Sequence, residues 1–130
     1  MVSLKPESEV QQLIQIEAAK HGCLLMRNNS GAFKDESGRI IFFGLGNVSK
    51  QSGEQMKSSD LIGITTFAYG IKWNVGIFVA IECKREGWIF NPKDKREQAQ
   101  LNFINLMKSR GAIAGFCASV EDFKKLIGVN

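Results

Sequence analysis

The stretch Ile77-Phe78-Val79-Ala80-Ile81-Glu82-Cys83-Lys84 decides the fold, because a continuous apolar run ends here in charged residues. The run is apolar on both faces and rich in β-branched and aromatic residues, which predicts a central strand covered on both sides. Alternate side chains of a strand share a face, so Glu82 and Lys84 should project together and Cys83 should point the other way. A carboxylate and an ammonium group are therefore expected side by side where a buried strand ends.

A second carboxylate, Asp60, stands immediately before another apolar run and completes a candidate metal site. Mg²⁺ prefers oxygen ligands, binds through one or two carboxylates and keeps several waters, so Asp60 and Glu82 could supply its protein ligands. Lys84 could then orient a nucleophile or neutralise the charge that develops on a phosphoryl group. This combination predicts metal-dependent hydrolysis of phosphodiester bonds. Taken alone, Glu-x-Lys is also typical of a solvated ion pair at a strand end.

The rest of the chain is expected to fold in the order helix, strands, helix, strand, helix. The first helix is predicted over residues 6–20, because Pro6 suits a first turn and Gly22 can close the last one. Further strands are predicted over residues 23–28, 39–43, 61–64 and 112–118. A second helix is predicted over residues 93–110, and Ser119 is expected to cap the last helix.

Two polar residues lie beside the apolar faces of the predicted helices. Glu9 precedes Leu13 and Ile16 by four and seven residues, so it should border the buried stripe of the first helix. Gln100 precedes Phe103 by three residues, which puts both on one face of the second helix. Neither side chain need be fully solvated.

This order of elements and polar residues resembles that of the PD-(D/E)XK nuclease superfamily, and within it the VRR-NUC domain. The segments that carry the likeness are Arg27-Asn28-Asn29-Ser30-Gly31, Ser59-Asp60-Leu61-Ile62-Gly63-Ile64, Ile81-Glu82-Cys83-Lys84 and Gln100-Leu101-Asn102-Phe103, followed by Gly111 and Ala114-Gly115. The resemblance covers almost the whole chain. It implies an α/β fold with a restriction-endonuclease-like core, in which a central mixed sheet is flanked by helices.

The resemblance also implies roles for individual residues. Asp60 and Glu82 would bind Mg²⁺ or Mn²⁺, the main-chain carbonyl of Cys83 is a candidate for a further oxygen ligand, and Lys84 would be the catalytic lysine.

Glu9 matches the acidic residue of the first helix in this family, and Gln100 matches the glutamine of the second helix. Glu7 and Gln98 are the alternatives, but each lies two positions away on a different helix face. We therefore favour Glu9 and Gln100 as members of the catalytic site.

Two features depart from the family pattern. Residues 47–58 form a longer and more polar approach to the aspartate than the family would have, and they predict a mobile loop that either orders on DNA or is solvated without a role. Ser59 stands where the superfamily has a proline, which matters little because a metal needs the carboxylate of Asp60 and not the proline.

Composition agrees with these expectations. A chain of 130 residues that is 44% hydrophobic can bury one core, so we expect a single domain over residues 1–130. No stretch is apolar enough to span a membrane and no signal segment is apparent, which predicts a soluble, cytoplasmic protein. The three cysteines lie in apolar strands and are expected as buried thiols. With one histidine, a Ser-His-Asp or Cys-His mechanism is disfavoured.

The distribution of charge favours an anionic partner. The net charge is +4, and residues 84–96 hold five basic and two acidic residues next to the proposed metal site. The candidate DNA contacts are Arg85, Lys93, Lys95 and Arg96 in this segment and Arg27, Asn28 and Asn29 after the second element. A solvated face and an Asn-Ser-Gly turn are the respective alternatives. Trp88 and Phe90 could stack on DNA, although burial in the core is the commoner use of such residues.

The resemblance implies a homodimer that resolves four-way (Holliday) junctions, without a small-molecule cofactor. Symmetry gives an independent reason, because cutting two opposed strands of a two-fold junction requires two sites related by a two-fold axis. Apolar residues 40–43 are the candidate dimer surface. A flap or duplex nuclease is one alternative. A non-catalytic DNA-binding module is another, but clustered carboxylates repel phosphate unless a metal is bound.

Overall fold

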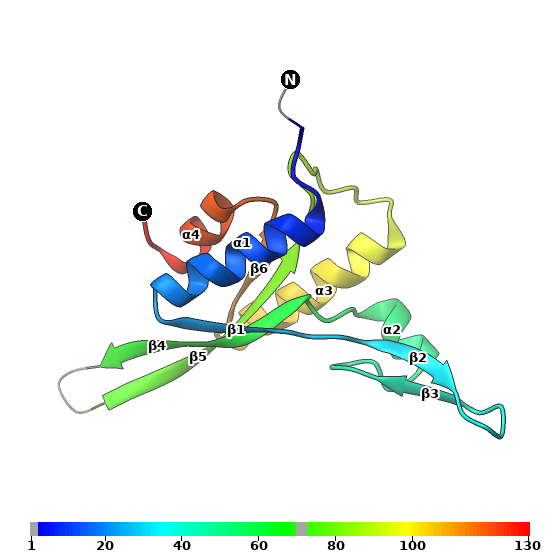
Figure 1. The fold of residues 1–130 in the computed structure, drawn as a ribbon. Helices are drawn as coiled ribbons and strands as arrows, with labels where there is room; N and C mark the ends of the chain where they lie inside the picture. Colours follow the sequence, from blue (N-terminus) through cyan, green and yellow to red (C-terminus); the bar gives the residue numbers. More distant parts are fainter. Residues whose placement is uncertain (1–2, 70–72) are drawn as a thin grey trace.

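A four-stranded mixed sheet forms the centre of the computed structural model, which describes residues 3–69 and 73–130 (Figure 1). The elements in chain order are α1 (Glu7–Lys20), β1 (Cys23–Arg27), β2 (Gly31–Lys34), β3 (Ile40–Phe43), α2 (Lys50–Gln55), β4 (Leu61–Tyr69), β5 (Trp73–Cys83), α3 (Lys95–Ser109), β6 (Ile113–Cys117) and α4 (Val120–Ile127). The strand order is β1-β4-β5-β6, with β4 antiparallel to β1 and β5, and β6 parallel to β5. The protein is therefore of the mixed α/β class, with helices on both sides of a mixed sheet, as the sequence predicts.

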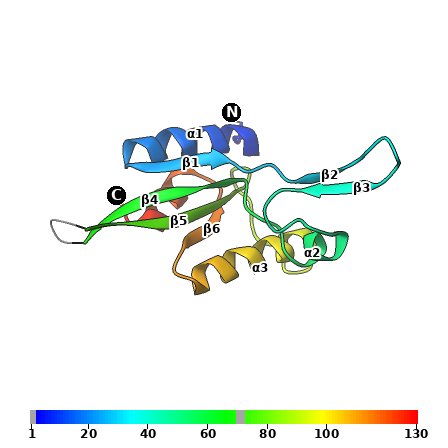
Figure 2. The same ribbon diagram turned by 90° about the horizontal axis from the view of Figure 1, so that it is seen from below.

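Helices cover the two faces of this sheet unequally. Helices α1 and α4 pack on one face, and α3 packs on the other, as Figure 2 shows from below. The core under α1 and α4 contains Val10, Ile14, Ala18, Cys23, Leu25, Leu61, Val79, Ile81, Cys83, Cys117 and Phe123. The core under α3 contains Ala80, Phe103, Ile104 and Ala114. Strand β5 thus alternates between two cores, which confirms it as the central strand.

Close packing of the strands is visible at one glycine of β4. A Cβ atom at Gly63 would lie 1.7 Å from the carbonyl oxygen of Leu24 on β1. Any larger residue would push the two strands apart and disturb their pairing. Because Asp60 stands just before β4, the tight β1–β4 contact also fixes where its carboxylate lies.

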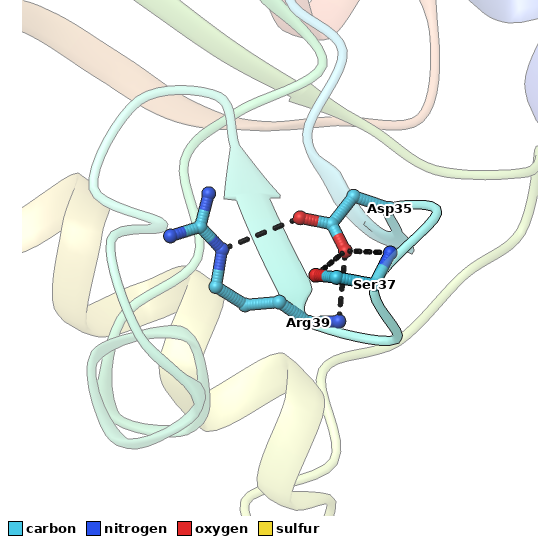
Figure 3. A network of polar contacts seen from close by, with 3 residues as sticks. All are labelled: Asp35, Ser37 and Arg39. Atoms are coloured by element: carbon cyan, nitrogen blue, oxygen red, sulfur yellow. Dashed lines mark hydrogen bonds and ion pairs between the residues drawn. The ribbon is translucent and has the colours of Figure 1, made fainter.

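Strands β2 and β3 form a separate two-stranded sheet that projects beyond the central sheet (Figures 1 and 2). The turn between them is held by Asp35, whose Oδ1 accepts hydrogen bonds from the Ser37 and Arg39 N–H groups at 3.0 and 2.9 Å (Figure 3). The Ser37 hydroxyl donates to the same oxygen at 2.6 Å. These bonds lower the pKa of Asp35, the Ser37 hydroxyl most strongly. Strand β2 is not among the strands predicted from the sequence, and only its first residue, Gly31, falls in the possible Asn-Ser-Gly turn.

The predicted mobile loop over residues 47–58 is wrong in one respect, because it contains helix α2. Ser49 caps this helix by accepting from the Ser52 N–H, and the Ser52 side chain accepts in return from the Ser49 N–H. The segment also binds α3: the Lys57 N–H donates to the Ala99 carbonyl at 3.0 Å, and Asn102 Nδ2 donates to the Gln55 carbonyl at 2.9 Å. Tertiary contacts therefore order a segment that lacks a periodic apolar pattern.

The other predicted elements are confirmed with small changes of boundary. Pro6 caps α1, Asp94 caps α3 and Ser119 caps α4. Strand β4 runs on to Tyr69, beyond the predicted residue 64. Cys23, Cys83 and Cys117 are buried free thiols, as predicted. Within the described ranges, no helix combines the length and apolar character that crossing a membrane requires.

Candidate active site

Asp60 and Glu82 meet where β4 begins and β5 ends. The Asp60 N–H donates to Glu82 Oε2 at 3.2 Å, and Asp60 Oδ2 accepts from the Cys83 N–H at 3.0 Å. Leu61 pairs with Ile81 in the sheet, so the antiparallel register brings two residues 22 positions apart into contact. The structure thus unites the two carboxylates that the sequence predicts as metal ligands.

Gln100 links this carboxylate pair to Lys84. Gln100 Nε2 donates to Glu82 Oε1 at 2.7 Å, and Lys84 Nζ donates to Gln100 Oε1 at 2.7 Å. Gln100 and Glu82 are each only 3% exposed. The amide therefore has both of its ends occupied by site residues, and the predicted grouping of Asp60, Glu82, Lys84 and Gln100 is found.

The first helix contributes Glu7 to this region instead of Glu9. Glu7 lines a cavity of about 240 Å³ together with Glu82, Lys84 and Gln100, and Glu9 does not line it, although both acids are exposed. The buried stripe of α1 is Val10, Ile14 and Ala18. Glu7 lies three and seven residues before the first two of these, so it shares the inward face. The preference for Glu9 assumed that Ile16 is buried, yet Ile16 is 57% exposed.

Burial and mutual repulsion favour protonation of the three acids. Burial raises the pKa of Glu82 from 4.5 to about 8, and the nearby charge of Asp60 adds to the effect. Burial also raises the pKa of Asp60, and burial followed by repulsion from Asp60 raises that of Glu7. Lys84 and Arg96 act against both of the latter shifts. The site is therefore short of positive charge next to its carboxylates.

An aromatic cluster also lies next to Lys84. Lys84 Nζ lies 5.3 Å from the ring centroid of Trp88 and 5.7 Å from that of Phe116. The Trp88 ring packs on Phe116 and Phe90, with centroid separations of 4.7 and 6.2 Å. These distances suit cation–π attraction, so the aromatic residues hold the ammonium group near the carboxylates. Both Trp88 and Phe90 are half-buried and pack within the protein.

A cavity of about 310 Å³ opens beside the carboxylates on the side of α2 and the β2–β3 hairpin. Its lining includes Asp60, Glu82, Arg96 and Gln100. Asn28, Asn29, Ser30, Gly31, Leu45, Asn47, Gly53, Met56, Lys57 and Ser58 line the remainder. We refer to it as the amide cavity, because three asparagines line its wall.

The predicted DNA-binding residues fall into two groups. Arg96, Asn28 and Asn29 line the amide cavity. Arg27, Arg85, Lys93 and Lys95 are exposed. Lys57 also lines the cavity, shortly after the end of α2. The sequence does not single it out, because residues 47–58 read as a uniformly polar loop.

The donor set suits a divalent ion of the Mg²⁺ type. Among residues 3–69 and 73–130, no three His, Cys, Asp or Glu side chains gather into a group that would hold a metal ion by themselves. Mg²⁺ does not require such a group, since it binds one or two carboxylates and keeps several waters. Asp60 and Glu82 are two adjacent hard-oxygen donors whose buried charges need compensation. The Cys83 carbonyl as a further ligand stays a prediction.

Comparison with protein-family models, with curated proteins and with solved structures finds no match to this chain.

Proposed function

We propose that this protein is a Mg²⁺- or Mn²⁺-dependent DNA endonuclease with a PD-(D/E)XK core of the VRR-NUC type. The observation that carries the proposal is the continuous chain of contacts from Asp60 through Glu82 and Gln100 to Lys84. Two carboxylates and a lysine are the groups that metal-assisted phosphodiester hydrolysis requires. A cavity large enough for part of a substrate opens directly onto the two carboxylates.

Each residue has a distinct part in the proposed reaction. Asp60 and Glu82 would hold the divalent ion, which when bound polarises a phosphoryl oxygen and lowers the pKa of a bound water. The Lys84 ammonium would stabilise the negative charge that develops at the phosphate. Gln100 keeps the Lys84 ammonium and the Glu82 carboxylate in fixed relative positions, and the aromatic cluster limits the movement of Lys84.

Arg96 and Lys57 extend positive charge along the substrate path. Both line the amide cavity, which Asp60 and Glu82 also line. Arginine and lysine bind phosphate oxygens by charge-assisted hydrogen bonds, and such contacts position nucleic acid without reading its sequence. The exposed Arg85, Lys93 and Lys95 would add contacts to more distant phosphates.

The proposed substrate is a four-way DNA junction cut by a homodimer. The described residues, 3–69 and 73–130, hold one such cluster, so two symmetric cuts require two copies of the chain related by a two-fold axis. The projecting β2–β3 hairpin is the proposed dimer surface, because Phe33, Ile40 and Phe43 are about half exposed on it. Apolar side chains at this density mark a surface suited to protein association.

The direct test separates catalysis from binding. Asp60→Asn and Glu82→Gln should each abolish cleavage of labelled DNA, while DNA binding in EDTA survives or improves because negative charge is removed. Glu121→Gln, an exposed acid on α4, is the matched control and should cleave as the unaltered protein does. Undiminished cleavage by both site variants would refute the assignment.

A further inference from the structure

The amide cavity has a polar wall that catalysis does not explain. The Asn28 amide donates to Ser58 Oγ and to the Ser59 carbonyl, both at 2.9 Å. Both of its hydrogens are thus used, which leaves Oδ1 as the atom that can accept from a ligand. Asn29, the next residue, is exposed and lines the same cavity. This wall therefore offers an acceptor and a complete amide to whatever enters.

Hydrogen bonds hold the part of the lining that Asn47 and α2 form. Asn47 Nδ2 donates to the Gly31 carbonyl at 2.8 Å and to the Phe43 carbonyl at 3.0 Å, which ties the base of the hairpin to the following loop. Helix α2 approaches so closely that a Cβ at Gly53 would lie 2.6 Å from Asn47 Oδ1. The Lys57 N–H then fastens the end of this segment to α3. The cavity is hence bounded by hydrogen-bonded backbone on either side.

The size and chemistry of the cavity indicate its ligand. A volume of about 310 Å³ lies at the lower limit for small-molecule sites, which admits one nucleoside-sized group but not a stacked base pair. Side-chain amides present donors and acceptors together and so complement the edge of a nucleobase. Leu45 and Met56 add apolar surface suited to the face of a base. Arg96 and the proposed metal ligands line the same cavity and suit a phosphate.

We propose that the amide cavity takes one unpaired nucleotide, with its base against Asn28 and Asn29 and its phosphate towards Asp60 and Glu82. This inference rests on the proposed nuclease function for the role of that phosphate. It specifies the substrate further: the nucleotide next to the cut must leave its base pair. Unpairing costs a few kcal/mol in a duplex and least where a base is already unpaired. Cleavage is thereby directed to branched or mismatched DNA.

Binding of small probes tests the cavity without any cleavage. The probes are a deoxynucleoside 5′-monophosphate, deoxyribose 5-phosphate and inorganic phosphate, each with Mg²⁺, followed through the side-chain amide signals of Asn28, Asn29 and Asn47 in NMR spectra. The nucleotide should shift these signals and bind about tenfold more tightly than the sugar phosphate, since base-edge contacts supply the difference. Equal affinity of the nucleotide and the sugar phosphate would overturn the inference.

Filling the cavity gives a matched pair of variants. Leu45 lines the cavity, whereas Val48 lies three residues on, is 81% exposed and lies outside the lining. Leu45→Trp should weaken nucleotide binding by about tenfold and Val48→Trp should not. Asn29→Phe provides a second filling variant at an exposed position. Unchanged nucleotide affinity in both filling variants would contradict the assignment.

A cleavage assay then tests whether nucleotide binding in the cavity affects the reaction. A duplex with one mismatch at the scissile nucleotide should be cut about tenfold faster than the paired duplex, and Leu45→Trp should erase this preference. If the unaltered protein and Leu45→Trp both cut the mismatched and the paired duplex at equal rates, the inference would be overturned and the nuclease function would stand. If no DNA is cut but nucleotide binding depends on Leu45, the nuclease function fails and the nucleotide site stands.

Discussion

Gln100 donates a 2.7 Å hydrogen bond from Nε2 to Oε1 of Glu82, and this bond directs its amide oxygen to Lys84. The side chain is buried in the first half of α3, so it acts as a rigid bridge between a carboxylate and an ammonium group. We attribute the geometry of the site chiefly to this residue.

Gln100→Ala should reduce the turnover number for DNA cleavage by about 100-fold, because small displacements of reacting groups have effects of this size. The loss should exceed any change in DNA affinity. Gln98→Ala is the control, since Gln98 is exposed on the same helix. Steady-state kinetics, with circular dichroism to verify folding, would measure the difference, and equal rates for the two variants would contradict the bridging role.

The two acids of the first turn of α1 give a second matched pair. Glu7→Gln should raise the Mg²⁺ concentration needed for half-maximal cleavage by about tenfold, because an outer carboxylate near the metal ligands contributes to metal affinity. Glu9→Gln should leave it unchanged, because Glu9 does not line the cavity that Glu7 shares with Glu82 and Lys84. If Glu9→Gln raised this Mg²⁺ concentration more than Glu7→Gln does, Glu9 would be the site residue, as the sequence predicts.

Stability should depend on pH through Glu82. Its pKa rises on folding from 4.5 to about 8, so the folded protein binds more protons than the unfolded chain between these values. The free energy of unfolding in EDTA should therefore fall as the pH rises through this window. Urea unfolding at several pH values would measure the slope, and Glu82→Gln should make it shallower.

Metal binding should oppose this fall in the free energy of unfolding with rising pH. A divalent ion binds the ionised carboxylates and displaces protons, so Mg²⁺ or Mn²⁺ should stabilise the fold more near pH 8 than near pH 5. Calorimetric Mn²⁺ titration in buffers of different ionisation enthalpy should show proton release. Stabilisation that is independent of pH would indicate that the ion binds elsewhere.

The aromatic support of Lys84 leads to a fifth prediction. Trp88→Ala should lower cleavage by about threefold to thirtyfold, the range expected for loss of one cation–π contact. Trp88→Phe should retain most of the activity because it keeps a ring. The upfield ring-current shift of the Lys84 ε-methylene protons should disappear in Trp88→Ala, and an unaltered shift would show that the contact does not exist in solution.

The exposed hairpin provides a test of assembly. Changing both Ile40 and Phe43 to glutamate should convert a dimer into monomers in sedimentation experiments, since charges at an interface lose hydration without gaining partners. Val48→Glu, at an exposed apolar position after the hairpin, is the control. A dimer that persists in the double variant would place the interface elsewhere.

The fold follows from local sequence where one signal dominates. The continuous apolar run of β5 predicts a buried central strand, and alternation along it predicts that Glu82 and Cys83 face opposite cores. The capping residue Ser119 and the closing Gly22 mark helix boundaries, because their chemistry acts within one turn.

The other features of the fold and of the site depend on contacts between residues that are distant in the sequence. Whether Glu7 or Glu9 faces the site depends on the rotation of α1 about its axis, which its packing on the sheet determines. Helix α2 has six residues and includes a glycine, so its order depends on contacts with α3 that no local pattern announces. The amide cavity likewise arises only when residues near 28, 47 and 57 meet.

Cleavage of a labelled immobile four-way junction, beside a flap and a linear duplex of matched sequence, tests the central claim most directly. Each substrate would be incubated with Mg²⁺, with Mn²⁺ or with EDTA. The account predicts paired symmetric nicks on the junction that disappear in EDTA and in Asp60→Asn. Tight binding of all three DNAs without cleavage under any metal condition would contradict it and would favour a binding module that keeps the fold alone.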